Sequence, residues 1–190
     1  EGAFYSSEDA DSEGKEGAFY VWKFEELSAL LSTDDMLMFK ELYDIWDSGN
    51  FRDEATRTRS GLNVLHRIRS LRDLASMKGM DPEEMYAWDE RVRAALWSHR
   101  QKRPRPALDD KVLTDWNALA IWALAFTGMV FHDESLCIRA VSAAEFLFST
   151  MVQPDGVVLH RWRRGQAGIA GTAGDYLNLA WASMALYQAT

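Results

Sequence analysis

The residues best suited to chemistry gather just ahead of a strongly apolar segment. Two adjacent carboxylates and a lysine, Asp109, Asp110 and Lys111, are followed closely by Trp116 and Asn117. Carboxylates, an indole face and the free N–H groups of a helix start are typical of a site for a sugar or another polar ligand. The alternative interpretation of the same residues is helix capping and a surface salt bridge.

A second acidic group lies near the N-terminus. The spacing of Asp9, Asp11 and Glu13, followed by Gly14, imitates the first ligands of an EF-hand calcium loop. The bidentate glutamate that such a loop requires would fall on Tyr20. We therefore expect no metal ion and no other cofactor, and we interpret the loop as a solvated turn or as the rim of a cleft.

Basic and imidazole groups follow later in the chain. His160 and Arg161 belong to a basic segment with Arg163 and Arg164, which could contact anionic sugar or phosphate groups. A salt-bridged surface segment is the alternative. His66 follows the apolar residues Val64 and Leu65, and we interpret it as a hydrogen-bonded structural residue.

The hydrophobic pattern predicts mainly helices, joined by loops that carry short strands. The segment 118–126 is apolar on every face, so we expect it to be buried on all sides. Asp175 and Tyr176 open a last helix of the same kind. The other expected helices span 24–31, 34–46, 70–78, 81–101, 133–151 and 175–190. The expected short strands span 1–5, 16–20, 63–66 and 157–162. Asp109, Asp110 or Thr114 could cap the helix that contains 118–126. We expect 165–174 to be flexible.

Composition narrows the functional classes. The 190 residues are 47% hydrophobic and carry a net charge of −8, with a pI near 5.0. The negative charge argues against a nucleic-acid-binding domain, whose footprint is a broad basic face. The single cysteine, Cys137, excludes an intrachain disulfide, and neither a signal peptide nor a membrane span is evident. We expect no membrane association and a cytoplasmic location.

Helices that are apolar all round alternate with amphipathic ones. Such alternation is what a ring of helical hairpins requires, because the inner helices are covered on every side and the outer ones face water. We therefore expect a mainly α fold, a partial α/α toroid with short β-hairpins in its loops.

Four segments, in the same order, resemble the spermatogenesis-associated protein 20 family, also called YyaL-like. They read Phe-Tyr-Ser-Ser-Glu-Asp-Ala-Asp-Ser-Glu-Gly (4–14), Glu-Gly-Ala-Phe-Tyr-Val-Trp (16–22), Asp-Asp-Lys-Val-Leu-Thr-Asp-Trp-Asn (109–117) and Asp-Tyr…Ala-Leu-Tyr-Gln-Ala-Thr (175–190). The resemblance implies a thioredoxin-like N-terminal domain followed by a six-hairpin toroid similar to glycosidases and sugar 2-epimerases. Residues 1–190 would be a fragment of one toroid domain, about half of it, without the thioredoxin-like domain.

The resemblance also implies a cleft for carbohydrate. We expect Asp110 and Asp175 to act as general acid and base, with Asp9 as a substitute. A 2-epimerase reaction would instead need a basic side chain, for which His66 and His160 are the candidates. The residues expected to bind substrate are Glu8, Asp11, Asp109, Lys111, Trp116, Asn117, His160, Arg161 and Tyr176, with the two aromatic rings stacking on the sugar.

Whether the cleft is catalytic stays open at this point. The alternative is a non-catalytic interaction domain that works with the absent thioredoxin-like domain, because a toroid fold does not define a function. A partial toroid would also expose the apolar flanks of its inner helices, so we expect a homo-oligomer.

Overall fold

The computed structural model describes residues 2–52 and 58–190, which contain seven helices and short antiparallel strands. The mainly α prediction is confirmed. These residues form two compact units, which are described separately. The first unit is Ala10–Ala107, and the second combines the N-terminal residues up to Asp9 with Leu108–Thr190.

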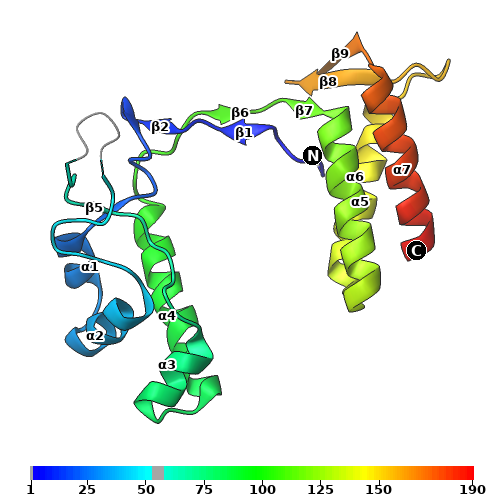
Figure 1. Ribbon diagram of the computed structural model, residues 1–190. Coiled ribbons are helices and arrows are strands. Elements are labelled where there is room, and N and C mark those ends of the chain that lie inside the picture. Colours follow the sequence, from blue (N-terminus) through cyan, green and yellow to red (C-terminus); the bar gives the residue numbers. More distant parts are fainter. Residues whose placement is uncertain (1, 53–57) are drawn as a thin grey trace. The chain divides into compact units, whose positions relative to one another are not determined.

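Four helices make the core of the first unit (Figure 1). Three of the helix starts are capped by a side chain that accepts a backbone N–H, namely Ser32, Ser70 and Asp81. Gly79 ends the third helix in the left-handed conformation that favours glycine. The helices are α1 (Phe24–Leu30), α2 (Thr33–Leu42), α3 (Leu71–Lys78) and α4 (Pro82–Arg100). Helix α2 therefore ends four residues earlier than predicted.

A tight hairpin opens the first unit. Strands β2 (Asp11–Ser12) and β3 (Lys15–Glu16) pair across Glu13 and Gly14, whose φ angles are 54° and 70°. Two successive positive φ angles match the right-handed twist of the flanking strands. The predicted strands 1–5 and 16–20 were wrong: residues 2–5 lie in no strand, 17–20 form a turn, and Glu1 lies outside the described residues.

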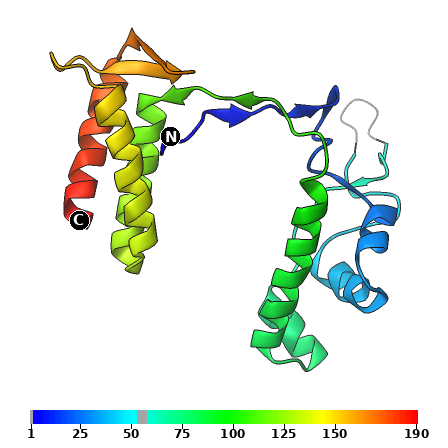
Figure 2. The same ribbon diagram turned by 180° about the vertical axis from the view of Figure 1, so that it is seen from behind.

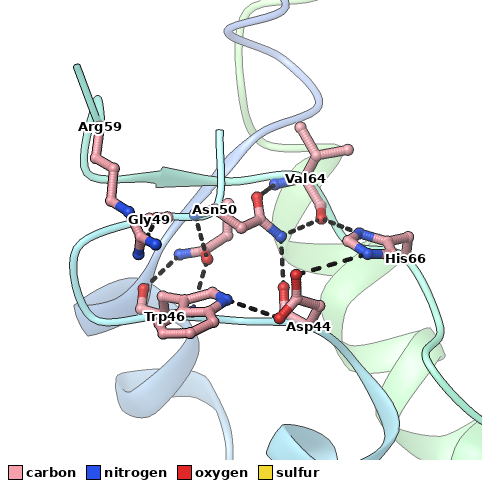
Figure 3. Close-up of polar contacts among 8 residues, drawn as sticks. Asp44, Trp46, Gly49, Asn50, Arg59, Val64 and His66 are labelled. Carbon is pink, nitrogen blue, oxygen red and sulfur yellow. Dashed lines mark hydrogen bonds and ion pairs between the residues drawn. The ribbon is translucent and has the colours of Figure 1, made fainter. Parts of the chain in front are cut away.

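Two asparagine side chains organise the loop after α2, and Figure 3 shows one of them, Asn50, beside Val64. Asn50 bonds both the N–H and the C=O of Val64, at 2.8 and 2.9 Å. Asn63 does the same for Trp46, at 2.9 and 3.1 Å. Each amide thus occupies the place of a neighbouring β-strand. The predicted strand at 63–66 is confirmed only as β5 (Leu62–Asn63), which pairs with β4 (Trp22–Lys23).

Three neighbouring helices form the body of the second unit (Figures 1 and 2). Helix α5 (Thr114–Phe131) packs against both α6 (Glu134–Thr150) and α7 (Ala173–Ala189). Small residues on all three helices allow close approach. The buried alanines of this core are Ala118, Ala125, Ala140, Ala143, Ala144, Ala182 and Ala185. These helices place the N-terminal ends of α5 and α7 on the same side.

A three-stranded sheet lies at that end of the helices (Figures 1 and 2). Strand β8 (Leu159–Arg163) pairs with both β7 (Val112–Leu113) and β9 (Gln166–Ala170). The expectation that 165–174 is flexible was wrong, because β9 occupies 166–170 and α7 begins at Ala173. Arg164 and Gly165, at φ 49° and 81°, make the same kind of tight turn as in the first unit. A separate pair joins β1 (Ser7–Glu8) to β6 (Leu108–Asp109).

The sequence predicted that the helix around 118–126 is buried on all sides. This prediction was wrong, because one side of α5 is exposed. Its exposed stripe contains only apolar residues, Trp116, Leu119, Ala123, Phe126 and Val130. The stripe is open because α6 and α7 cover two sides of α5 and the described residues provide no third neighbour for it. Among the residues described, no helix is both long and apolar enough to cross a bilayer.

Candidate functional site

Asp175 is a carboxylate buried at the start of α7. It has no solvent exposure, and both of its oxygens accept hydrogen bonds. The N–H of Thr172 donates to it at 2.7 Å and the Thr172 hydroxyl at 2.9 Å. The backbone N–H of Asp115, in the first turn of α5, donates at 3.1 Å. Asp175 therefore ties together the N-terminal ends of two helices.

The fourth partner of Asp175 is His160 on strand β8. The Nδ1 atom of His160 lies 2.9 and 3.1 Å from the two carboxylate oxygens. The imidazole is partly exposed, whereas the carboxylate is fully buried. A ring held at one nitrogen by a buried carboxylate has a defined orientation, which is the arrangement found in catalytic dyads.

The charge of Asp175 determines which nitrogen of His160 carries the proton. Burial raises the pKa of Asp175, but hydrogen bonds from His160 and from the backbone and hydroxyl of Thr172 together outweigh it and hold this pKa below its usual value. Asp175 is therefore an acceptor at neutral pH, and Nδ1 of His160 must be the donor. In the neutral ring, Nε2 is then left as a proton acceptor.

Asp115 lies beside this pair. One ligand atom from each of Asp115, His160 and Asp175 lies within 4.8 Å of the others, a spacing that could hold a metal ion. Two features disfavour a cation here. Both oxygens of Asp175 already accept hydrogen bonds, and the trio sits at two helix N-termini, where the dipole repels positive charge.

Asp110 has different partners from Asp175. It lies between β6 and β7 and pairs with Arg163, and with Arg164 at 3.4 Å. The hydrogen bond from Arg163 is the main reason that the pKa of Asp110 is lowered. Asp110 is therefore ionised at neutral pH, as a general base must be. Its role as one half of an acid–base pair stays a prediction.

Strand alternation separates the basic residues of β8. His160 and Trp162 lie on one face of the strand, and Arg161 and Arg163 on the other. The Nε atom of Arg161 is buried without a hydrogen-bond partner among the described residues. Arg161 is thus placed on the side of Asp110 and not on the side of His160.

Each of the two predicted stacking residues directly follows an aspartate of the site. Trp116 follows Asp115 and is half exposed, and its backbone N–H donates to the Asp115 side chain at 2.9 Å. Tyr176 follows Asp175 and is also partly exposed, but its hydroxyl accepts the N–H of Val158 at 3.0 Å. Both rings have free surface for a ligand.

Asn117 has a structural role in this arrangement. It is buried, and its amide bonds the N–H and the C=O of Phe4 at 2.8 and 3.0 Å, as well as the carbonyl of Leu113 at 2.9 Å. The side-chain amide of Asn117 is therefore occupied by backbone groups of the same unit. Asn117 therefore holds the N-terminal segment against α5.

The remaining predicted residues lie on the loops that precede α5 or near the N-terminus. Lys111 pairs with Asp109 at 2.9 Å. Glu8 and Asp9 are exposed in the second unit, and Asp11 is exposed in the first. The structure thus unites Asp175 and His160, and adds Asp115, which the sequence interpretation left out of the site. Its position in the first turn of a helix was the available signal.

Comparison with known proteins gives the context for this site. No family model matches the chain. Spermatogenesis-associated protein 20 from human is 34% identical over 164 aligned residues, which cover 77% of this chain. The mouse and rat proteins of that name are 34% and 32% identical over the same share.

The chain belongs to the spermatogenesis-associated protein 20 family. This confirms the resemblance carried by the four sequence motifs. The chain spans about a fifth of the length of the human and mouse members of the family, since the matches cover 21% of each. The match therefore does not establish the activity of the whole protein for this chain.

Proposed function

We propose that this chain is about half of an α/α toroid that binds and processes carbohydrate, with His160 as the group that moves a proton. The observation that carries the proposal is the contact between Nδ1 of His160 and buried Asp175 at 2.9 Å. It leaves Nε2 as the proton acceptor, and a partly exposed imidazole can reach a ligand.

The surrounding residues fit a sugar. Two partly exposed aromatic rings, Trp116 and Tyr176, follow directly after the two carboxylates of the site, and aromatic faces are suited to stacking on a pyranose ring. Asp115 carries a carboxylate that can accept hydrogen bonds from hydroxyl groups. Of the two carboxylates that the sequence predicted as an acid–base pair, we propose that only Asp110 takes part in proton transfer.

We propose different roles for the two residues of the dyad. Asp175 is fully buried with both oxygens occupied, so we propose that it positions His160 and does not touch the substrate. His160 would abstract the proton, either from a sugar carbon next to a carbonyl, as in a 2-epimerase reaction, or from an attacking water. Asp9 stays a substitute for Asp110.

The test is turnover and binding with a panel of neutral and phosphorylated mono- and disaccharides. Exchange of carbon-bound hydrogen with heavy water, followed by NMR, detects epimerisation, and release of reducing ends detects hydrolysis. We expect His160→Gln to lower turnover by about 10²–10⁴-fold while a saccharide still raises the melting temperature. His66→Gln is the matched control, since His66 is the other candidate base.

Unchanged turnover in His160→Gln would exclude His160 as the proton-transfer group. Loss of turnover in His66→Gln alone would move the reaction to the first unit. If no saccharide shifts the melting temperature of the wild type, the proposal that this chain binds carbohydrate is wrong.

The second candidate function is a non-catalytic interaction domain. The observation that favours it is the apolar stripe of α5, which continues onto α7 through contact of Trp122 with Trp181 at 4.7 Å between ring centroids. Exposed apolar patches of this kind mark interfaces. We propose a second copy of the chain or the thioredoxin-like domain as the partner.

Light scattering tests this second function. A dimer that dissociates in Phe126→Ser would support an interface at the stripe, because Phe126 is half exposed and can be replaced without opening the core. A monodisperse monomer of 21.6 kDa would contradict self-association.

A further inference from the structure

Arg100, at the end of α4, has no hydrogen-bond acceptor among residues 2–52 and 58–190. Its guanidinium lies over the rings of Trp97, Phe19 and Tyr20, at 5.0, 5.6 and 5.6 Å from their centroids. Its Nε atom is buried without a hydrogen-bond partner in the described chain. A buried donor that makes no hydrogen bond is unfavourable, so an acceptor that reached this guanidinium would be bound favourably.

Neighbouring Arg103, in contrast, has hydrogen-bond acceptors for its guanidinium group. It donates to the carbonyls of Phe19 and Val21, both at 2.8 Å, and to Glu26 at 2.7 Å. Its guanidinium also lies 4.2 Å from the centroid of Trp22. Arg103 therefore holds the loop before α1, whereas the interactions of Arg100 with the described residues are those with aromatic rings.

Arg100 lines a cavity of about 600 Å³ within the first unit. The walls are mainly apolar and aromatic, and include Trp22, Tyr43, Leu65 and Trp97. This volume falls in the range of small-molecule sites. Trp97 is more than half exposed, so the cavity has an accessible face.

The charges along the cavity are carried by one side of α4. Glu90, Arg93, Trp97 and Arg100 follow at helical spacing, so they share a stripe. Arg93 lies 3.8 Å from Asp89, which also pairs with Arg67 at 2.6 Å. Glu90 is about 15 Å from Arg100 along the helix axis, too far to neutralise it.

We propose that this cavity binds a small molecule that carries a carboxylate or phosphate group on a planar apolar body. The anion pairs with Arg100, whose fork of N–H groups suits two oxygens of one oxyanion. The three aromatic rings keep the guanidinium in place before the ligand arrives. The apolar part of the ligand packs on Trp97, the exposed aromatic ring of the cavity.

The test is calorimetric titration with four probes: phenyl phosphate, benzoate, inorganic phosphate and benzyl alcohol. We expect phenyl phosphate or benzoate to bind, and the two partial probes to bind at least about tenfold more weakly. Arg100→Gln should weaken the binding of the amphiphilic anion by about tenfold or more, and Arg100→Lys by less. The matched control is Arg139→Gln, which makes the same charge change at an exposed residue of α6. It should leave the affinity unchanged.

Equal affinity in wild type and Arg100→Gln overturns the proposal, as does the absence of binding up to about 10 mM for both amphiphilic anions. If Arg100→Gln does not fold, Trp97→Ala serves in its place, since Trp97 is largely exposed and its loss opens the wall without disturbing the core. Retained affinity in Trp97→Ala would equally contradict the proposal.

Discussion

Nδ1 of His160 lies 2.9 Å from a carboxylate oxygen of Asp175, a residue with no solvent exposure. The contact joins strand β8 to the first turn of α7. The same carboxylate accepts the N–H of Asp115 at the start of α5. One buried charge therefore orients an imidazole and holds the ends of two helices, and the first two predictions follow from this double role.

Asp175→Asn should reverse the tautomer of His160. An asparagine can present its NH₂ group to Nδ1, so the ring no longer needs a proton there, and Nε2 becomes the protonated nitrogen. We expect the ¹⁵N chemical shifts of His160 to change from a protonated Nδ1 to a protonated Nε2. Turnover of any substrate should fall by about 10³–10⁴-fold, as expected when a dyad adopts the wrong tautomer. Unchanged ¹⁵N shifts would contradict the assigned hydrogen bond.

Acid should destabilise both units through carboxylates whose pKa is lowered by folding. In the second unit this is Asp175, and in the first it is Asp35, which accepts from Arg91 at 2.7 and 3.0 Å, and from Trp88 and Ser32. A group whose folded pKa is lowered stabilises fully above its unfolded pKa, about 3.9 for aspartate, and this contribution is lost as the pH falls through the folded value.

We therefore expect the free energy of unfolding in urea to be constant near neutral pH and to decrease below about pH 4–5. Asp175→Asn should lower it by about 2 kcal/mol at pH 7 and should show a smaller further loss in acid. A mutant that loses as much stability between pH 7 and pH 3 as the wild type would show that Asp175 titrates normally.

Asn117→Ala should release the N-terminal segment from α5. The buried amide makes three hydrogen bonds, two of them to Phe4, and its removal leaves backbone groups without partners. We expect a loss of about 2–3 kcal/mol in unfolding free energy and faster hydrogen exchange at the Phe4 amide. Asn178→Ala on α7 is the control, because this side chain makes no hydrogen bond in the described part of the chain. Equal exchange at Phe4 in wild type and Asn117→Ala would refute this role.

Alanine substitutions at two glycines of the first unit distinguish the cost of backbone strain from the cost of steric overlap. Gly49 and Gly61 have nearly equal φ angles, 78° and 75°. A Cβ at Gly49 would clash with the backbone of Leu62, while a Cβ at Gly61 meets open space. We expect Gly61→Ala to cost about 1 kcal/mol, from the left-handed backbone alone, and Gly49→Ala about 3 kcal/mol or more. Similar melting temperatures for the two variants would contradict the close approach at Gly49.

The helices could be predicted from the sequence because their signals are local. Asp81 followed by Pro82 marks a helix start, and Gly79 marks a helix end, through contacts within a few residues. The two short hairpins were missed or misplaced for the opposite reason. Glu13-Gly14 and Arg164-Gly165 adopt two positive φ angles in succession, and residues such as Glu and Arg seldom indicate that turn.

The site shows the same division. The sequence by itself determined the helix-forming pattern, the family, and that His160 and Asp175 are groups able to transfer or hold protons. Only the tertiary structure decided that these two meet, because they lie on a strand and a helix separated by a complete hairpin. It also decided that Asn117 binds the backbone of Phe4, a contact across more than a hundred residues. Side-chain type follows from the sequence, whereas a hydrogen-bond partner depends on which distant backbone and side-chain groups packing brings within about 3 Å.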